Sequence, residues 1–357
     1  MSGFEPFWAE AERGAPDDPP RCAYIAAAYG QGDRFRTKRL IAGAGQGYAL
    51  LAQDSWSGGD VVIKGMWWPR AVLDEPREVK AELGGQRGRR ESGLVAARRA
   101  AQLTQQCPVV ISLESQPSPT LRAAGVPFDE EDEEGFLVQE FIGYRNTGAR
   151  TLQDEIERRA GRNQRYTESE LLDLAEQLCN TLAALHTTRH TDKGEVVKGW
   201  VHADIKPENI LVLGPPDRYV LIDYDAAVRI GARITTTTVA YAPPGPEGGD
   251  ETAELAPASE RYDIYMLGAT LAHAARLARL TPKQTRGLYY GSQDVQGRVR
   301  REISDPRFGP ILNSVISTCL APQKYRLATV DRVRADLARA RSATALLGAL
   351  RALEHRS

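Results

Sequence analysis

This chain has few cysteines, and their spacing fits neither a disulfide framework nor a metal site. Cys22, Cys107, Cys179 and Cys319 stand singly, without a Cys-x-x-Cys pair or an adjoining histidine cluster. This scarcity excludes a small secreted fold stapled by disulfides and gives no support to a thiolate zinc site. We therefore expect reduced, mostly buried thiols in a cytosolic protein.

Long apolar runs and an excess of one charge are also missing. No run approaches the roughly 18 apolar residues that a membrane-spanning helix needs. The 46 Lys and Arg nearly balance the 47 Asp and Glu, so no basic surface for nucleic acid is indicated. The acidic N-terminus lacks the basic-then-apolar order of a signal peptide. The sequence predicts a cytoplasmic protein with neither a membrane nor a nucleic-acid partner, and it leaves the oligomeric state open.

What is present is a hydrophobic share of 42% over 357 residues, enough for one large domain or two lobes. Strand-like segments come first and helical ones later, which predicts an α+β protein with a sheet-rich lobe followed by a helical lobe. An acidic run from Asp129 to Glu134 is interpreted as a solvated loop. Strands are expected at 48–52, 61–64, 109–113, 136–142 and 219–222, and helices at 77–105, 171–186, from 262 and from 330.

The same patterns divide the chain into four segments. The first is rich in Pro, Gly and acid, and Phe7 and Trp8 are expected to pack it on the body as aromatic anchors. The segments are an N-terminal extension at 1–34, a first lobe at 35–140, a second lobe at 141–336 and a C-terminal helical tail at 337–357.

The most informative stretch reads VHADIKPENILV and begins at Val201. It sets the carboxylate of Asp204, the ammonium of Lys206 and the amide of Asn209 at fixed offsets in a short loop ahead of an apolar strand. A phosphoryl-transfer site needs these groups close together. The carboxylate orients the acceptor hydroxyl, the ammonium neutralises the moving phosphoryl group, and the amide oxygen holds a metal ion.

This stretch resembles the catalytic loop of the protein-kinase family, HRDLKPEN, with Ala203 in place of the usual Arg. The DYD sequence that begins at Asp223, directly after the strand at 219–222, is similar to the family's metal-binding DFG. The resemblance implies a bilobal protein-kinase-like fold, with a small antiparallel-sheet N-lobe and a larger helical C-lobe. It also implies ATP as the phosphoryl donor and Mg²⁺ held by Asn209 and Asp223.

Two upstream features resemble the family's phosphate-binding parts. Lys64 ends a VVIK strand similar to VAIK, which implies an ammonium placed over the α- and β-phosphates. The run AGAGQG at 42–47 corresponds off-pattern to GxGxxG. Its Gly43, Gly45 and Gly47 could still bring backbone N–H groups near phosphates.

Two further features complete the nucleotide side of the resemblance. Glu91, in RESGLV, is similar to the family's REAxxL and is the preferred partner of Lys64, whereas Glu82 has the more usual spacing and stays an alternative. The strand that ends near Glu140 resembles the hinge that holds adenine. This implies main-chain contacts from Glu140 and Ile142.

The segment TVAYAPPGPE, which begins at Thr238, resembles the end of a kinase activation segment, GTPxYxAPE. The resemblance implies that the Thr238 hydroxyl braces the catalytic Asp and Lys. It also implies that Asp263 fixes the backbone of the catalytic loop. Arg326 stands where the family places a partner for the segment's glutamate, here Glu247.

Together these resemblances imply ATP-dependent phosphoryl transfer to Ser or Thr hydroxyls of protein substrates. Asp204 would orient the nucleophile and take its proton late, and Lys206 would stabilise the γ-phosphoryl group. The Arg that Ala203 replaces usually pairs with a phosphorylated residue of the activation segment. We therefore expect activity without phosphorylation of the threonine run at 235–237.

Three other interpretations remain open. A small-molecule kinase of the aminoglycoside-phosphotransferase type shares the implied fold and often has a small residue where Ala203 stands, but it usually lacks the Lys-Pro pair at Lys206 and the APE-like segment. A nucleotide-binding pseudokinase would use the fold as a scaffold, which the off-pattern glycine run favours. A structural protein unrelated to kinases would require every spacing to be accidental.

Overall fold

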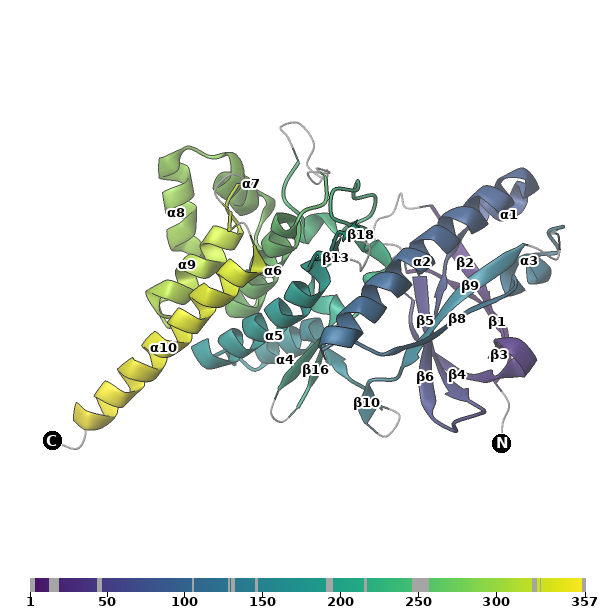
Figure 1. The fold of residues 1–357 in the computed structure, drawn as a ribbon, viewed down its shortest axis with the longest axis horizontal. Coiled ribbons are helices and arrows are strands. Elements are labelled where there is room, and N and C mark those ends of the chain that lie inside the picture. The colour runs from purple at the N-terminus through teal and green to yellow at the C-terminus, as the bar shows by residue number, and fades with distance from the viewer. Residues whose placement is uncertain are drawn as a thin grey trace. The chain divides into compact units, whose positions relative to one another are not determined.

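In the computed structural model the chain divides into two compact units. The first unit comprises Met1–Arg98 and Pro108–Gly148, and the second comprises Arg99–Cys107 and Ala149–Ser357. Helices make up about 48% and strands about 24% of a mixed α/β protein with several small antiparallel sheets (Figure 1). The residues that the structure describes are 4–12, 19–43, 47–104, 106–127, 129, 132–144, 147–190, 195–214, 217–245, 257–322, 326–327 and 329–354.

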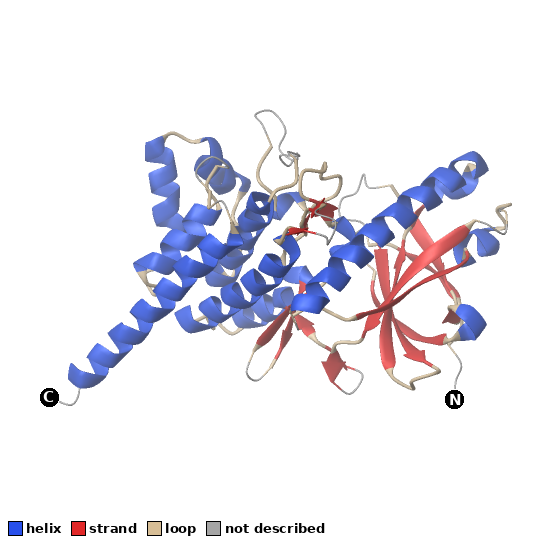
Figure 2. Cartoon of the chain, in the orientation of Figure 1, coloured by secondary structure: helices blue, strands red, loops and turns tan. Residues whose placement is uncertain are grey.

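The first unit is built on a six-stranded sheet in the order β3-β4-β5-β6-β9-β8, drawn with its strands in red in Figure 2. Side chains alternate along β5, so Tyr48, Leu50 and Ala52 are buried and pack with Ile63 and Val138 of neighbouring strands. The strands expected at 48–52, 61–64, 109–113 and 136–142 are confirmed as β5 (Gly47–Asp54), β6 (Asp60–Met66), β8 (Val110–Pro117) and β9 (Glu133–Glu140). The other strands of this part are β3 (Ala28–Tyr29) and β4 (Phe35–Ala42), with a short pair β10 (Gly143–Tyr144) and β11 (Thr147–Gly148).

One long helix, α2 (Val79–Leu103), confirms the helix expected at 77–105. Val79 and Leu83 at its beginning pack with Leu121 of α3 in a small apolar cluster of the first unit. Arg90, in the middle of α2, is 1% exposed and is among the most completely buried large side chains. The shorter helices of this unit are α1 (Arg70–Asp74) and α3 (Pro119–Ala124).

The N-terminal segment is held by strand pairing and by buried residues other than Phe7 and Trp8. Phe7 and Trp8 keep 39% and 43% of their surface exposed, which corrects the expectation that they anchor the segment. Ile25 and Tyr29 instead lie in the core of the first unit. The segment expected as an extension is therefore integrated into this unit. Its three-stranded antiparallel sheet consists of β1 (Phe7–Glu10), β2 (Arg21–Ile25) and β7 (Trp68–Pro69).

The acidic run that begins at Asp129 is not a solvated loop along its whole length. Glu133 and Glu134 belong to β9, and Glu134 is 2% exposed. Burial raises the pKa of Glu134 to about 7, against a hydrogen bond that the Ser118 hydroxyl donates to it at 2.6 Å. The loop prediction is wrong at this end because the alternation of β9 turns Glu134 inward.

The second unit is helical and is built around α6, in which every residue from Tyr262 to Ala275 is buried. The leucine stripe of α5 is confirmed as a core face that packs with α6. The C-terminal helix α10 lies beside α5 and α9 (Figure 1) and is continuous across the segment boundary expected after residue 336. The helices are α4 (Leu152–Gly161), α5 (Glu168–His186), α6 (Glu260–Arg276), α7 (Pro282–Tyr290), α8 (Gln293–Ile303), α9 (Pro310–Cys319) and α10 (Val330–Glu354).

Short antiparallel pairs position the loop at residues 202–209, which contains the motif of interest, within this helical unit. β15 pairs with β18, and β16 pairs with β17, so the segments on either side of the motif are fixed by main-chain hydrogen bonds. The strand expected at 219–222 is confirmed as β17. The strands are β12 (Arg150–Thr151), β13 (Arg189–His190), β14 (Val196–Val197), β15 (Trp200–Val201), β16 (Ile210–Leu213), β17 (Arg218–Leu221) and β18 (Val228–Arg229).

All four cysteines are buried thiols, as expected from their single spacing. Burial raises the pKa of Cys319 to about 12, so its reactive thiolate form is suppressed. Among the helices of the described residues, none is both long enough and apolar enough to cross a bilayer.

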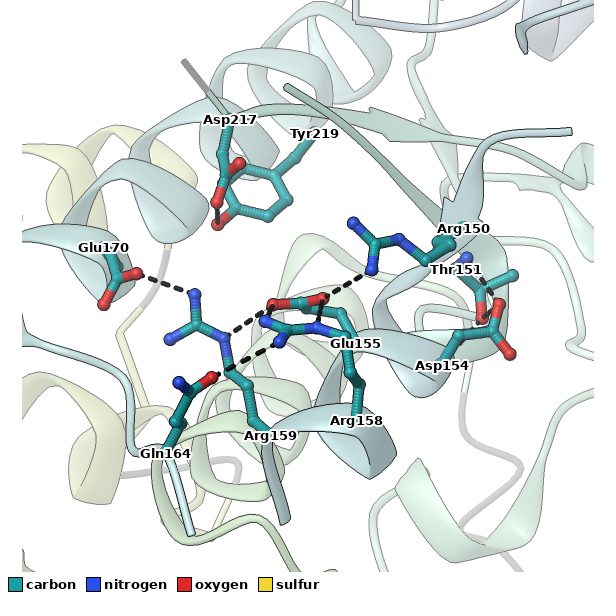
Figure 3. A network of polar contacts seen from close by, with 10 residues as sticks. All are labelled: Arg150, Thr151, Asp154, Glu155, Arg158, Arg159, Gln164, Glu170, Asp217 and Tyr219. Carbon is teal, nitrogen blue, oxygen red and sulfur yellow. Dashed lines mark hydrogen bonds and ion pairs between the residues drawn. The ribbon is translucent and has the colours of Figure 1, made fainter. Parts of the chain in front are cut away.

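An ion-pair network ties α4 to α5 in the second unit (Figure 3). The Glu155 carboxylate accepts from Arg158 at 2.5 Å and from Arg159 at 2.8 Å, and Arg150 lies 3.6 Å away. Arg159 also reaches Glu170 on α5 at 2.7 Å. The hydrogen bond from Arg158 is the main reason why the pKa of Glu155 falls to about 2, although burial opposes it. Glu155 is therefore an anion throughout the physiological range.

We expect Gly65→Ala to destabilise the first unit. A Cβ at Gly65 would lie 2.1 Å from a ring carbon of the buried Tyr48, which cannot give way without disturbing the sheet. The cost in the free energy of unfolding should be about 1–3 kcal/mol. Gly88→Ala in α2 is the matched control, since a Cβ there meets nothing within 4 Å and should stabilise by about 0.5–1 kcal/mol. Denaturant unfolding measures both, and equal effects would contradict the close approach.

Candidate active site

The loop at residues 202–209 joins β15 to β16 in the second unit. Ala203 adopts the left-handed conformation, with φ 63°, which costs a non-glycine residue roughly 1–2 kcal/mol. The Asp263 carboxylate offsets this cost, because it accepts hydrogen bonds from the N–H groups of His202 at 2.8 Å and of Ala203 at 2.9 Å. The expected contact between Asp263 and the loop backbone is therefore confirmed.

Asp263 is fully buried, and its charge is balanced by a histidine. Nε2 of His186 lies 2.8 Å from Asp263 Oδ2, and Nδ1 lies 3.5 Å from a Glu260 carboxylate oxygen. Burial alone would lower the pKa of His186, but the hydrogen bonds and charges of these two acids outweigh it and raise the pKa to about 9. At neutral pH the side chain is an imidazolium paired with Asp263.

The Asp204 carboxylate is held by four donors. Oδ1 accepts from the hydroxyl of Thr238 at 2.6 Å and from its N–H at 3.0 Å. Oδ2 lies 2.9 Å from both the Lys206 ammonium and the Asn209 amide nitrogen. These four contacts fix the orientation of the carboxylate, so it is placed to orient a hydroxyl group.

Thr237 and Thr238 form further hydrogen bonds with the loop at residues 202–209. The Lys206 ammonium donates to the Thr238 hydroxyl at 2.7 Å, which confirms that Thr238 contacts both expected catalytic residues. The preceding Thr237 donates its hydroxyl to the Ala203 carbonyl at 2.7 Å. Thr237 therefore ties the run to the loop at residues 202–209, a contact that the sequence pattern did not indicate.

The two expected metal ligands are neighbours at the ends of paired strands. Ile222, directly before Asp223, donates its N–H to the Asn209 carbonyl at 2.9 Å, and Asp223 adopts a left-handed conformation with φ 65°. The Asn209 amide nitrogen faces two acceptors on Asp204, its carbonyl and a carboxylate oxygen, so the Oδ1 atom is directed away from them. This oxygen and the Asp223 carboxylate are hard donors of the type that Mg²⁺ prefers. Within the described residues no group of three or more His, Cys, Asp or Glu side chains could hold a metal ion.

The residues expected on the nucleotide side lie in the first unit. Lys64 is half-buried on β6, opposite Ala49 of β5 and Leu137 of β9. A Cβ at Gly47 would lie 2.5 Å from the Gly65 carbonyl oxygen, so this position requires glycine. Gly43 has more room, with the Trp67 ring 3.3 Å from a built Cβ. Gly45 lies outside the described residues.

The expected partner of Lys64 is not decided by the contacts of the two glutamates. Glu91 is exposed on α2 and accepts from Arg87 at 3.1 Å. Glu82 is less exposed and accepts from Gln86 at 3.0 Å. Glu91 and Glu82 therefore both stay predicted partners of Lys64.

The expected hinge residues follow a confirmed strand. Glu140, the last residue of β9, donates its N–H to the Val109 carbonyl at 2.9 Å, and Ile142 lies beyond the end of the strand. Their contacts with adenine stay predictions. Arg326 donates to the carbonyls of Ala321 and Arg261, while Glu247, its expected partner, lies outside the described residues.

The structure thus brings together the expected residues of the second unit, Asp204, Lys206, Asn209 and Thr238. His186 was missed as a functional residue, because a histidine at the end of a leucine stripe reads as part of the core. Comparison with protein-family models finds no family that matches, and comparison with curated proteins finds no significant match either.

We expect the pair of His186 and Asp263 to make stability depend on pH. The pKa of His186 is raised from 6.5 to about 9 on folding, so its stabilising effect is complete below pH 6.5 and is lost as pH rises through 9. As pH rises through 9, the free energy of unfolding should fall by an amount that comes from this pair, on the order of 1–3 kcal/mol. His186→Gln should remove that contribution. Denaturant unfolding of both proteins at several pH values provides the measurement. Parallel pH profiles would show that His186 is not a buried cation.

Proposed function

We propose that this protein transfers the γ-phosphoryl group of ATP to Ser or Thr hydroxyls of protein substrates, on a bilobal protein-kinase-like fold. The observation that carries the proposal is the cluster that Asp204, Lys206 and Asn209 form with Thr238. The first three lie on a loop whose strained backbone is fixed by Asp263. A carboxylate, an ammonium and an amide held this closely match what phosphoryl transfer requires.

In the proposed reaction the acceptor hydroxyl lies against Asp204. The bond between the γ-phosphorus and the bridging oxygen of ATP breaks as the bond to the acceptor oxygen forms. ADP leaves with the bonding electron pair, and the hydroxyl proton passes to Asp204 late in the step. Lys206 lies 2.9 Å from Asp204 and supplies positive charge beside the transferred group.

Asn209 and Asp223 are the residues proposed to hold Mg²⁺, which would neutralise charge on the phosphates when bound. In the first unit, Lys64 is proposed to bind the α- and β-phosphates, with Glu91 or Glu82 as its partner. Gly43, Gly45 and Gly47 would bring main-chain N–H groups to the phosphates, and Glu140 and Ile142 would contact adenine.

A hollow next to the catalytic cluster supports a protein acceptor over a small one. It has a volume of about 390 Å³ and is lined by Val239, Ala240 and Ala242, which directly follow Thr238, together with residues of α7 and the turn before it. Such a hollow begins one residue from the side chain that braces Asp204, so it can hold a side chain next to the acceptor residue. An aminoglycoside-type phosphotransferase remains the alternative, because Ala203 fits that class as well.

We expect Asp204→Ala to abolish most phosphoryl transfer without loss of folding. Removal of the orienting carboxylate should lower the rate by about 10²- to 10⁴-fold. Asp294→Asn, on the exposed start of α8, is the control and should retain the full rate. Labelled ATP with generic protein substrates, aminoglycosides and the protein alone provides the measurement. Label on aminoglycosides alone would favour the alternative acceptor, and nucleotide binding without any transfer would overturn the proposal in favour of a pseudokinase.

We expect turnover to depend on hydroxyl hydrogen bonds of the threonine run and not on its phosphorylation. Thr235→Ala with Thr236→Ala should retain activity, because within the described residues neither side chain forms a hydrogen bond with the loop at 202–209. Thr237→Val should lower the rate, since it removes the hydrogen bond to Ala203, worth about 1 kcal/mol. Turnover of both variants is compared with their phosphorylation state by intact mass. Loss of turnover in the double variant would contradict independence from phosphorylation.

A further inference from the structure

The hollow that follows Thr238 has two sides, and both belong to the second unit. One side is formed by residues of the segment 239–245, and the other by residues of the segment 279–286, which covers the turn before α7 and its first half. The Tyr290 hydroxyl of α7 donates to the Pro244 carbonyl at 3.0 Å and so joins the two sides. The volume of about 390 Å³ is within the range of about 300–1,000 Å³ that is usual for ligand pockets.

Much of the lining is apolar. Val239 and Leu280, on opposite sides of the hollow, can contact the carbon atoms of an entering side chain. Two threonine hydroxyl groups also belong to the lining, but both are used within the start of α7. The hydroxyl of Thr281 caps the helix, and that of Thr285 donates to the Pro282 carbonyl at 3.0 Å. The hydroxyl groups are therefore engaged, and any ionic contact must come from other groups of the lining.

The charged groups of the lining are cationic. Among the described residues that line the hollow, Arg279 and Arg286 carry charge and none is a carboxylate. Arg279 is exposed, and within the described part of the chain it forms no ion pair. After burial, its charge is the main reason why the pKa of His273 falls to about 4, and Nδ1 of this histidine lies 2.8 Å from the Tyr241 hydroxyl. The neutral His273 thus adds no charge behind this side of the hollow.

One carboxylate of the loop at 202–209 also acts on Tyr241. Burial is the main reason why the pKa of Tyr241 is raised, and Glu208 raises it further, whereas Arg279 lowers it. Glu208 is exposed and is not among the residues that line the hollow. A side chain inside the hollow would therefore meet the two arginines, while Glu208 lies outside it.

We propose that the hollow selects protein substrates with an acidic side chain, aspartate or glutamate, next to the acceptor residue, and that Arg279 determines this specificity. The inference rests on the proposed function, because the hollow begins one residue after Thr238, which contacts Asp204. The apolar lining would contact the methylene groups of the side chain. The guanidinium groups of Arg279 and Arg286 would bind its carboxylate, since their planar N–H donors fit carboxylate oxygens. A lysine at the same position would face two like charges.

Peptide turnover tests the proposal on the full-length protein. Peptides with one serine, and with glutamate, alanine or lysine at each flanking position in turn, are compared by kcat/KM with labelled ATP. At one position glutamate should exceed lysine by about tenfold. Arg279→Glu should reverse this preference. Arg279→Lys should retain it in weaker form, because lysine keeps the charge but not the paired donors.

A matched control separates the hollow from a general effect of charge. Arg300→Glu makes the same change of charge on an exposed residue of α8 that does not line the hollow. It should leave the preference for glutamate over lysine unchanged. Arg279 and Arg300 are both exposed, so neither substitution should unfold the protein, and thermal unfolding of each variant checks this.

Peptide binding without ATP distinguishes failure of this inference from failure of the proposed function. The glutamate peptide should bind about tenfold more tightly than the lysine peptide, measured by fluorescence anisotropy, and Arg279→Glu should reverse that order. This result without transfer of label to any peptide would overturn the proposed function and support the acidic preference of the hollow. Equal turnover and binding of all peptides, absence of both, or a preference that Arg279→Glu leaves unchanged would overturn the inference.

Discussion

The contact between Asp263 and the loop at His202 and Ala203 is the constraint on which the candidate site depends. Two backbone N–H groups converge on one carboxylate, and this holds Ala203 in a conformation that alanine seldom adopts. The His186 imidazole lies 2.8 Å from this buried carboxylate and is its counter-charge. The geometry of the following residues, Asp204 above all, is set by this buried pair.

Three buried ionisable side chains differ in how far neighbouring groups compensate their burial. Asp263 has a cation and two N–H donors, so its charge is well compensated. Glu134 has one hydroxyl donor, and its pKa rises towards neutrality because its burial is only partly offset. Arg99 is 8% exposed, and its buried Nε and Nη2 atoms have no hydrogen-bond partner within the described residues.

The site in the second unit could be predicted well from sequence because its members lie close together along the chain. Asp204, Lys206 and Asn209 fall within one short loop, and the strand pair next to it brings in Asp223. Contacts between distant segments were harder to foresee. The bond from Thr237 to Ala203 and the partners of Glu91 depend on side-chain directions that periodicity does not contain.

The sequence by itself determined the main strands and helices, the order of sheet-rich and helical parts, and the spacing of Asp204, Lys206 and Asn209, because these depend on local periodicity and turn chemistry. Only the tertiary structure decided which charges are buried and what faces them. It turned Glu134 inward, paired His186 with Asp263 and buried Arg99. The reason is that the free energy of a buried charge depends on groups brought near by the fold, and residues far apart in the chain supply most of them.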